Sequence, residues 1–148
     1  MTGLFVTSAF ARADVLDNDG VLKDASGKVL QMTQVQAIGA CASHGMHLPT
    51  IRELVKLSSS TGLVLTDENP TPFTTLVVAV DLNGSPDRFI FNHDSFNRPL
   101  GILGSNEYWS SSAAAERPGH SYSLNLIFGE IRDWGSGLNN AVRCAAGR

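Results

Sequence analysis

The sequence predicts an α+β domain built from short elements and many turns, and three observations support this prediction. The chain has 148 residues, 14 of them glycine and 6 of them proline, a turn-rich composition that is unlike a helical bundle. Two patterns of threonine followed three residues later by glutamine or glutamate stand before apolar runs, which is typical of helix starts. Alternating or β-branched segments follow later in the chain, as in strands.

Composition limits the number of domains and the classes of partner. With 43% hydrophobic and 17% charged residues, the chain is long enough for one domain with its own core and too short for two. The formal net charge is -3, and the basic residues are scattered, so there is no basic field to attract phosphate backbones. No stretch approaches the roughly 18 to 20 apolar residues that span a bilayer. We therefore expect neither nucleic-acid binding nor membrane insertion.

The first helix is predicted over residues 34–43. Thr33 and Gln36 form a capping box, in which the hydroxyl accepts from a free helix N–H and the amide side chain reaches back. His44 and Gly45 end the helix, because glycine readily adopts the positive φ of a helix terminus. The apolar stripe expected to face the core consists of Val35, Ile38, Cys41 and Ala42.

The second helix is predicted over residues 51–58. Leu48 and Pro49 lead into a second capping box, made by Thr50 and Glu53. Its buried face is expected to be Ile51, Leu54, Val55 and Leu57.

The remaining elements are predicted to be short strands joined by turns. Residues 92–106 carry polar residues, proline and glycine with little periodicity, so they are predicted to form a long surface loop. Strands are expected as a small hairpin at 21–22 and 28–30, then at 73–80, 88–91 and 108–110, in the alternating run 121–126, and at 141–145.

Several phrases follow one another along the chain in a recognisable order. They are Ala37 and Cys41 in the first helix, Gly45, Leu48-Pro49-Thr50 with Glu53-Leu54, Tyr108-Trp109-Ser110-Ser111-Ser112, Gly129, and Val142-Arg143-Cys144. In this order and spacing the chain resembles bacterial C-type-lectin-like domains. The resemblance is to the C-terminal domains of collagen-like adhesins and related paralogous surface modules, and it covers roughly residues 21–145.

The resemblance implies two helices flanking a twisted, mostly antiparallel sheet, with the chain ends close together and a long loop region on one side. It also implies that Cys41 pairs with Cys144, and that Trp109 is a core anchor whose N–H needs a partner. Such a disulfide closes a loop of about 100 residues, which in the chain-entropy model stabilises by roughly 4 to 5 kcal/mol. Because disulfides persist in oxidising compartments, we expect a secreted or cell-surface protein.

The domain itself is expected to span residues 21–148, with residues 1–20 as a separate N-terminal segment. Leu4, Phe5 and Val6 suit an edge strand, whereas Ala11-Arg12-Ala13 looks like the small-residue cleavage site of a secretory signal. A third interpretation is the junction with a stalk or anchor. The sequence leaves these three readings of residues 1–20 open.

No metal or cofactor is expected. C-type lectins that bind sugars through calcium carry Glu-Pro-Asn or Gln-Pro-Asp in the long loop and Trp-Asn-Asp in a neighbouring strand, and this sequence has neither. The segment 17–20 reads Asp-Asn-Asp-Gly, like the start of a calcium loop, but the later ligands are absent and a polar turn is favoured. His44 and His47 straddle a helix end, where an imidazole can satisfy terminal carbonyls, and His93 and His120 stand alone.

We do not expect an enzyme. The run of serines at 110–112 has no nucleophile-elbow pattern and no identifiable base, so these side chains are expected to make hydrogen bonds to turns. Acidic loop residues could supply the carboxylate pair of a small glycoside hydrolase, but such residues are usually solvated. The acidic residues in question are Asp67, Glu68, Asp81, Asp87 and Asp94.

The favoured function is an extracellular binding or adhesion module that recognises a glycan or protein on another cell surface through its loop-rich face. Its more specific form, implied by the resemblance, is the tip of an adhesive fibre, which would be a homo-oligomer and a trimer in such a fibre. Aromatic residues beside Asn and Arg suit sugar stacking and hydrogen bonding, although the aromatic rings could equally be packed inside. The competing class is a structural domain whose surface mediates self-association only. The candidate contacts are Phe96, Asn97, Arg98, Trp134 and Asn139.

Overall fold

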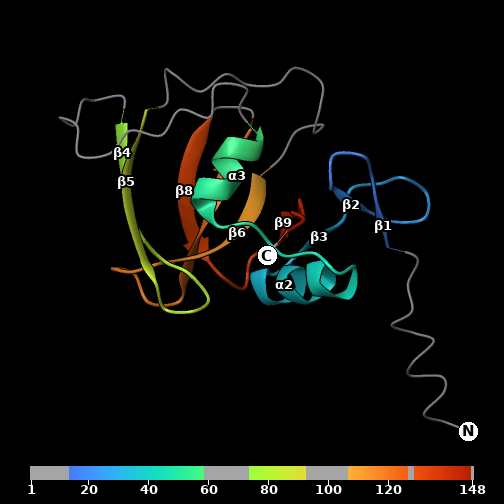
Figure 1. The fold of residues 1–148 in the computed structure, drawn as a ribbon, viewed down its shortest axis with the longest axis horizontal. Helices are drawn as coiled ribbons and strands as arrows, with labels where there is room; N and C mark the ends of the chain where they lie inside the picture. The colour runs from blue at the N-terminus through green and yellow to red at the C-terminus, as the bar shows by residue number, and fades with distance from the viewer. Residues whose placement is uncertain (1–13, 59–73, 93–106, 127–128, 148) are drawn as a thin grey trace, which may run out of the picture.

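The structure is a computed structural model that describes residues 14–58, 74–92, 107–126 and 129–147. Within these residues the fold is α+β, with two helices and a mostly antiparallel sheet (Figure 1). Both helices have the bounds that the sequence predicts, α2 at Gln34–Ser43 and α3 at Ile51–Ser58. The strands are β1 (Val15–Leu16), β2 (Leu22–Lys23), β3 (Gln31–Met32), β4 (Thr74–Val80), β5 (Pro86–Asn92), β6 (Glu107–Ala114), β7 (His120–Asn125), β8 (Glu130–Gly135) and β9 (Asn140–Ala141).

Strand β6 is the centre of the seven-stranded sheet. It pairs antiparallel with β7 along one side, antiparallel with β4 near its end, and parallel with β9 where Tyr108 lies opposite Ala141. The register with β7 shifts between Trp109 and Ala113, as in a β-bulge. Within the described residues, β5 and β8 each pair with a single neighbour, so both lie at edges of this sheet.

The serines of β6 act as structural hydrogen-bonding groups, although their partners are a strand and a helix start and not the turns that the sequence predicts. Ser110 Oγ donates to the carbonyl of Tyr122 in β7 (2.7 Å). Ser112 Oγ accepts from the backbone N–H of Ile51 (2.9 Å), the first residue of α3. The serines are buried, and they tie the central strand to its neighbour and to a helix start.

Helix α2 begins at the predicted capping box, with Gln36 N–H donating to Thr33 Oγ1 and Thr33 N–H donating to Gln36 Oε1. Its predicted buried stripe is wrong in part, because Val35 is 72% exposed and Ala42 is also exposed. The buried residues are Gln34, Ala37 and Cys41. Gln34 is buried because its amide donates to the carbonyl of Ser110 in β6 (3.0 Å), which satisfies a polar side chain inside the fold.

Helix α3 also begins at its predicted capping box, since Thr50 N–H donates to Glu53 Oε1 and Glu53 N–H donates to Thr50 Oγ1. Ile51, Leu54 and Val55 are fully buried, but the prediction that Leu57 is buried is wrong. Leu57 lies in the last turn of α3 and is 43% exposed, where the helix has passed the edge of the core.

The two helices cover opposite faces of the sheet around β6. Tyr108 belongs to the core cluster that contains the α3 residues Ile51 and Leu54, whereas the next residue, Trp109, belongs to the cluster that contains Cys41 of α2. Successive strand residues point to opposite faces, so α3 lies on one face and α2 on the other. Trp109 is fully buried and its indole N–H donates to the carbonyl of Met32 (2.9 Å), as its expected role of core anchor requires.

The predicted disulfide between Cys41 and Cys144 is present, with a Cα–Cα distance of 5.5 Å and 103 residues between them in sequence. Its C-terminal partner lies next to the beginning of the domain, because Cys144 N–H donates to the carbonyl of Gly20 (2.8 Å). Gly20 has φ 84°, and a Cβ on it would stand 2.5 Å from the Cys144 carbonyl oxygen. Only glycine fits this close approach without a shift of the backbone.

The predicted final strand at 141–145 is too long. The regular strand pairing ends with β9. After β9 there are isolated β-bridges to two different segments, from Arg143 to Val21 and from Ala145 to His47. These bridges join three separate segments at the C-terminal end of the chain, so no single ladder can form there. Residues 93–106 of the predicted surface loop lie outside the described residues.

The polar turn predicted at 17–20 is confirmed. Asp17 Oδ1 accepts the backbone N–H groups of Asp19 and Val21, and its other oxygen pairs with Lys23 (2.9 Å). The carboxylate is therefore occupied by the chain itself, in the manner of an Asx turn that closes a short hairpin. Strand β1, which precedes the predicted domain boundary at residue 21, pairs with β2.

Candidate polar surface on strands β6, β7 and β8

One face of the sheet carries a polar row that crosses three neighbouring strands. The register places Glu107 of β6 opposite Asn125 of β7, and it places Ser123 of β7 opposite Arg132 of β8. One step further along β7, Ser121 lies opposite Trp134. Residues paired in register point to the same face, so alternation along these strands gathers polar side chains on one side. This polar row is on the face that α2 covers elsewhere, since Trp109 is also paired with Ser123.

Glu107 is the hub of this surface. One carboxylate oxygen, Oε2, accepts from Ser123 Oγ (2.5 Å) and from the indole N–H of Trp134. The other, Oε1, accepts from Asn125 Nδ2 (3.3 Å) and from the guanidinium of Arg132 (3.4 Å). The side chain is only 13% exposed, so these four donors replace most of the water around a charged group.

Arg132 joins a second carboxylate to the cluster. Its Nε donates to Glu130 Oε2 at 3.3 Å, while its terminal nitrogen donates to Glu107. The guanidinium therefore lies between two carboxylates, and the three groups together carry a net charge of about one negative unit at neutral pH. This cluster fixes Glu107 and Arg132 in defined positions, which is the condition for a preorganised binding surface.

The indole of Trp134 lies across the middle strand of this surface. Its N–H bonds to Glu107, which is on β6, although Trp134 itself is on β8 and β7 runs between them. Ser121 and Ser123, the residues of β7 between these two strands, are short and fully buried. Trp134 remains 36% exposed, so part of the indole is accessible to a ligand.

The structure describes two of the five predicted contact residues. Trp134 is at the surface, and Asn139 is exposed in the segment between β8 and β9. Phe96, Asn97 and Arg98 lie outside the described residues. Sequence reasoning missed Glu107, Asn125 and Arg132. The alternation of Ser121, Ser123 and Asn125 marks a polar face, but the partners of that face follow only from strand register, which the sequence did not specify.

A second polar group lies near the β6–β7 turn. His120 Nδ1 is 2.9 Å from Asp133 Oδ1, and the guanidinium of Arg117 is 3.3 Å from the same oxygen. Asp133 lies opposite Tyr122 in the register, and His120 is two residues before Tyr122 along β7, so both point to the face opposite to Trp134. The carboxylate of Asp133 is thus held by a histidine and an arginine, and the group is best described as a polar cluster at a hairpin end.

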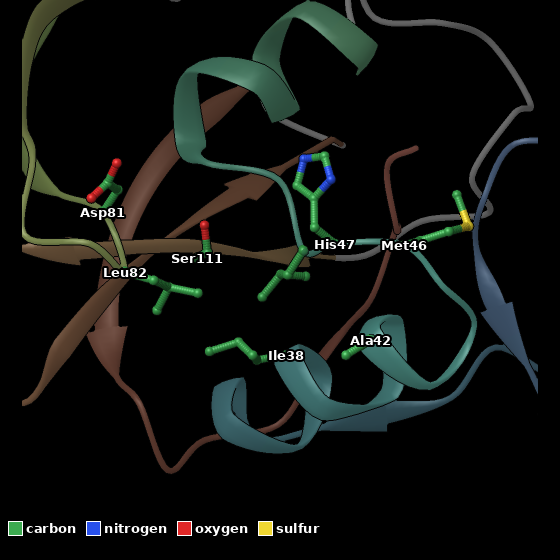
Figure 2. Close-up of a pocket in the computed structure, with 8 residues that line it drawn as sticks. Ile38, Ala42, Met46, His47, Asp81, Leu82 and Ser111 are labelled. Carbon is green, nitrogen blue, oxygen red and sulfur yellow. The ribbon is translucent and has the colours of Figure 1, made fainter. Parts of the chain in front are cut away.

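A small pocket lies between α2, the α2–α3 connection and the β4–β5 turn (Figure 2). It has a volume of about 110 Å³ and mostly apolar walls. Figure 2 shows Ile38 and Leu82 reaching into it from opposite sides, with the imidazole of His47 on the side of α3. The lining residues are Ile38, Ala42, Met46, His47, Leu48, Asp81, Leu82 and Ser111.

His47 does not bond to helix-end carbonyls, contrary to the sequence interpretation. Its Nε2 is 3.5 Å from Glu53 Oε1, but neither ring nitrogen has a hydrogen-bond partner, and both are inaccessible to water. They are equally inaccessible to a molecule in the pocket. The imidazole of His47 therefore offers no accessible nitrogen to a molecule in this pocket, whose walls are mostly apolar.

The remaining chemical candidates have structural partners where the structure describes them. Asp81 accepts two backbone N–H groups of its own turn, and Asp87 forms a bidentate pair with Arg52 of α3, whose guanidinium lies 4.6 Å from the centre of the Phe89 ring. Asp67, Glu68 and Asp94 lie outside the described residues. In the part of the chain that the structure describes, no group of three or more His, Cys, Asp or Glu side chains could hold a metal ion.

Comparison of the chain with protein-family models, with curated proteins and with solved structures finds no match. Among the described residues, no helix is long and apolar enough to cross a membrane.

Proposed function

We propose that this protein is an extracytoplasmic binding module of the C-type-lectin-like class, which recognises a glycan through the surface around Trp134. The observation that carries the proposal is a partly exposed indole whose N–H is bonded to Glu107. Sugars bind aromatic rings through their C–H faces and bind nearby carboxylates, amides and guanidinium groups through their hydroxyls. All these groups occur together on β6, β7 and β8.

Two further features support the proposal. The Cys41–Cys144 disulfide fits a protein that folds in an oxidising compartment, where adhesion modules act. The arrangement of two helices on either side of a mostly antiparallel sheet, with the start of the domain beside its C-terminal segment, is what the resemblance to C-type-lectin-like adhesin domains implies. The proposed binding groups are held by strands and not by loops alone. Less conformational entropy should therefore be lost when a ligand binds.

Glycan-array binding with matched variants of Trp134 tests this function. Trp134→Phe keeps an aromatic face but loses the N–H and the second ring, so it should keep measurable though weaker binding. Trp134→Ala removes the stacking face and should lower binding at least tenfold, since aromatic contacts dominate such sites. Val35→Ala, on the exposed side of α2, is the control and should bind like the wild type. Equal binding by Trp134→Ala and wild type would place the ligand elsewhere.

A second candidate function, self-association without small-ligand binding, has its own support in α2. The helix carries no charged side chain, Val35 on it is 72% exposed, and Leu82 beside the pocket is 62% exposed. The uncharged exposed side of α2 can meet a copy of itself without like-charge repulsion. Sedimentation velocity over a range of concentrations tests this function. A concentration-dependent oligomer that Val35→Lys and Leu82→Lys dissociate, together with an absence of glycan binding, would favour it.

A further inference from the structure

We infer that the Trp134 surface selects an uncharged glycan, and that its binding is insensitive to salt. This inference rests on the proposed function, and it adds the chemical class of the ligand. It follows from the charges around the indole. The guanidinium of Arg132 is held by Glu107 and Glu130 at 3.4 and 3.3 Å. It is the cation that the structure places in this cluster, and two carboxylates neutralise it.

A sulfated or uronic-acid sugar would meet an unfavourable surface here. An anionic group near Trp134 would approach two carboxylates and one guanidinium that is already paired with both. To use Arg132, the sugar would have to break at least one of these pairs and leave a carboxylate without its partner. Glu107 is 13% exposed and would lose its charged partner, keeping only the donors Ser123, Asn125 and Trp134. Breaking such a largely buried ion pair costs more than one sugar–guanidinium contact returns.

An uncharged pyranose meets no such conflict. Its C–H face can stack on the exposed part of the Trp134 indole, beside the short, buried side chains of Ser121 and Ser123. Its hydroxyls can donate to Glu130, whose side chain is 42% exposed. The ligand carries no charge, so screening by ions does not weaken the main contacts. The paired charges of Glu107, Arg132 and Glu130 thus provide the selectivity for a neutral sugar. The indole of Trp134 provides the affinity.

The test is a binding assay with two sets of probes at about 0.05 M and about 0.5 M salt. The neutral set contains oligosaccharides of hexose and N-acetylhexosamine, and the anionic set contains heparin and hyaluronan. We expect a member of the neutral set to bind, with its affinity changing less than twofold between the two salt concentrations. Glu130→Gln should weaken this binding several-fold, because the amide accepts fewer hydroxyl donors, and it should not make heparin bind.

Three results would overturn the inference. Binding of an anionic probe that falls at least tenfold with salt would show that the surface reads charge, while the proposed glycan-binding function would stand. Tighter binding of an anionic probe by Glu130→Gln would show that the carboxylate only repels the ligand. Absence of binding by every probe would remove both the inference and the proposed function, and would leave self-association as the remaining candidate.

Discussion

Removal of the Cys41–Cys144 disulfide should cost this domain a large part of its stability. The two cysteines are 103 residues apart, and in the chain-entropy model a cross-link over about 100 residues stabilises by about 4.7 kcal/mol. Domains of this size unfold with about 5 to 15 kcal/mol, so the loss is a third of the total or more. Both cysteines are buried, in the cluster that also contains Trp109.

The assay is equilibrium unfolding in urea of three forms of the protein. These are the oxidised wild type, the reduced wild type, and the double variant Cys41→Ala with Cys144→Ala. With a slope of about 2 kcal/mol/M, a loss of about 4 to 5 kcal/mol lowers the urea midpoint by about 2 M. The reduced wild type keeps both sulfur atoms, so the difference between it and the double variant separates the cross-link from packing. A loss below about 1 kcal/mol on reduction would refute the reasoning, as would two free thiols in the unfolded, unreduced protein.

Three further predictions concern the core and its edges. Burial raises the pKa of both tyrosines of the chain, of Tyr108 to about 12 and of Tyr122 above its usual value, so less tyrosinate absorbance should develop near pH 10 in the folded protein than in the unfolded one. Because the folded pKa of Tyr108 lies above the unfolded one, the protein should lose about 2 to 3 kcal/mol of stability as the pH rises from about 10 toward 12; full titration of both tyrosines near pH 10 under native conditions would contradict this. Gly20→Ala places a Cβ 2.5 Å from the Cys144 carbonyl oxygen at positive φ and should cost at least about 2 kcal/mol in urea unfolding, whereas Gly27→Ala, at a similar φ with open space around it, should cost less. Trp109→Phe leaves the buried Met32 carbonyl without its donor and should lower the free energy of unfolding by about 2 to 4 kcal/mol; an unchanged midpoint would show that water replaces the indole N–H.

The helices were predictable because their signals are local. Each capping box involves residues three apart, and both form the expected pair of hydrogen bonds. The faces of the helices were less predictable, since burial depends on what packs against them. Val35 is more apolar than Gln34, yet Gln34 is buried, because the carbonyl of Ser110, 76 residues away, accepts from its amide. No local pattern contains that acceptor.

The proposed binding surface illustrates the same limit. The sequence indicates Trp134 as a candidate contact because it is an aromatic residue near polar ones, and Trp134 lies at the surface. Its partner Glu107 is 27 residues earlier in the chain and reaches it only through the pairing of β6, β7 and β8. A bulge in β6 shifts that register, so alternation alone would misplace part of the row. Strand register, not residue type, decides which polar side chains meet.

The central claim is that a ligand binds on the exposed part of the Trp134 indole, and the indole N–H resonances test it most directly. The chain has two tryptophans, Trp109 buried in the core and Trp134 at the surface, so each nuclear magnetic resonance spectrum contains its own control. On titration with the neutral oligosaccharides, we predict that the Trp134 indole N–H signal shifts and saturates while the Trp109 signal stays in place. If a bound glycan leaves the Trp134 signal unmoved, the surface on β6, β7 and β8 is not the binding site.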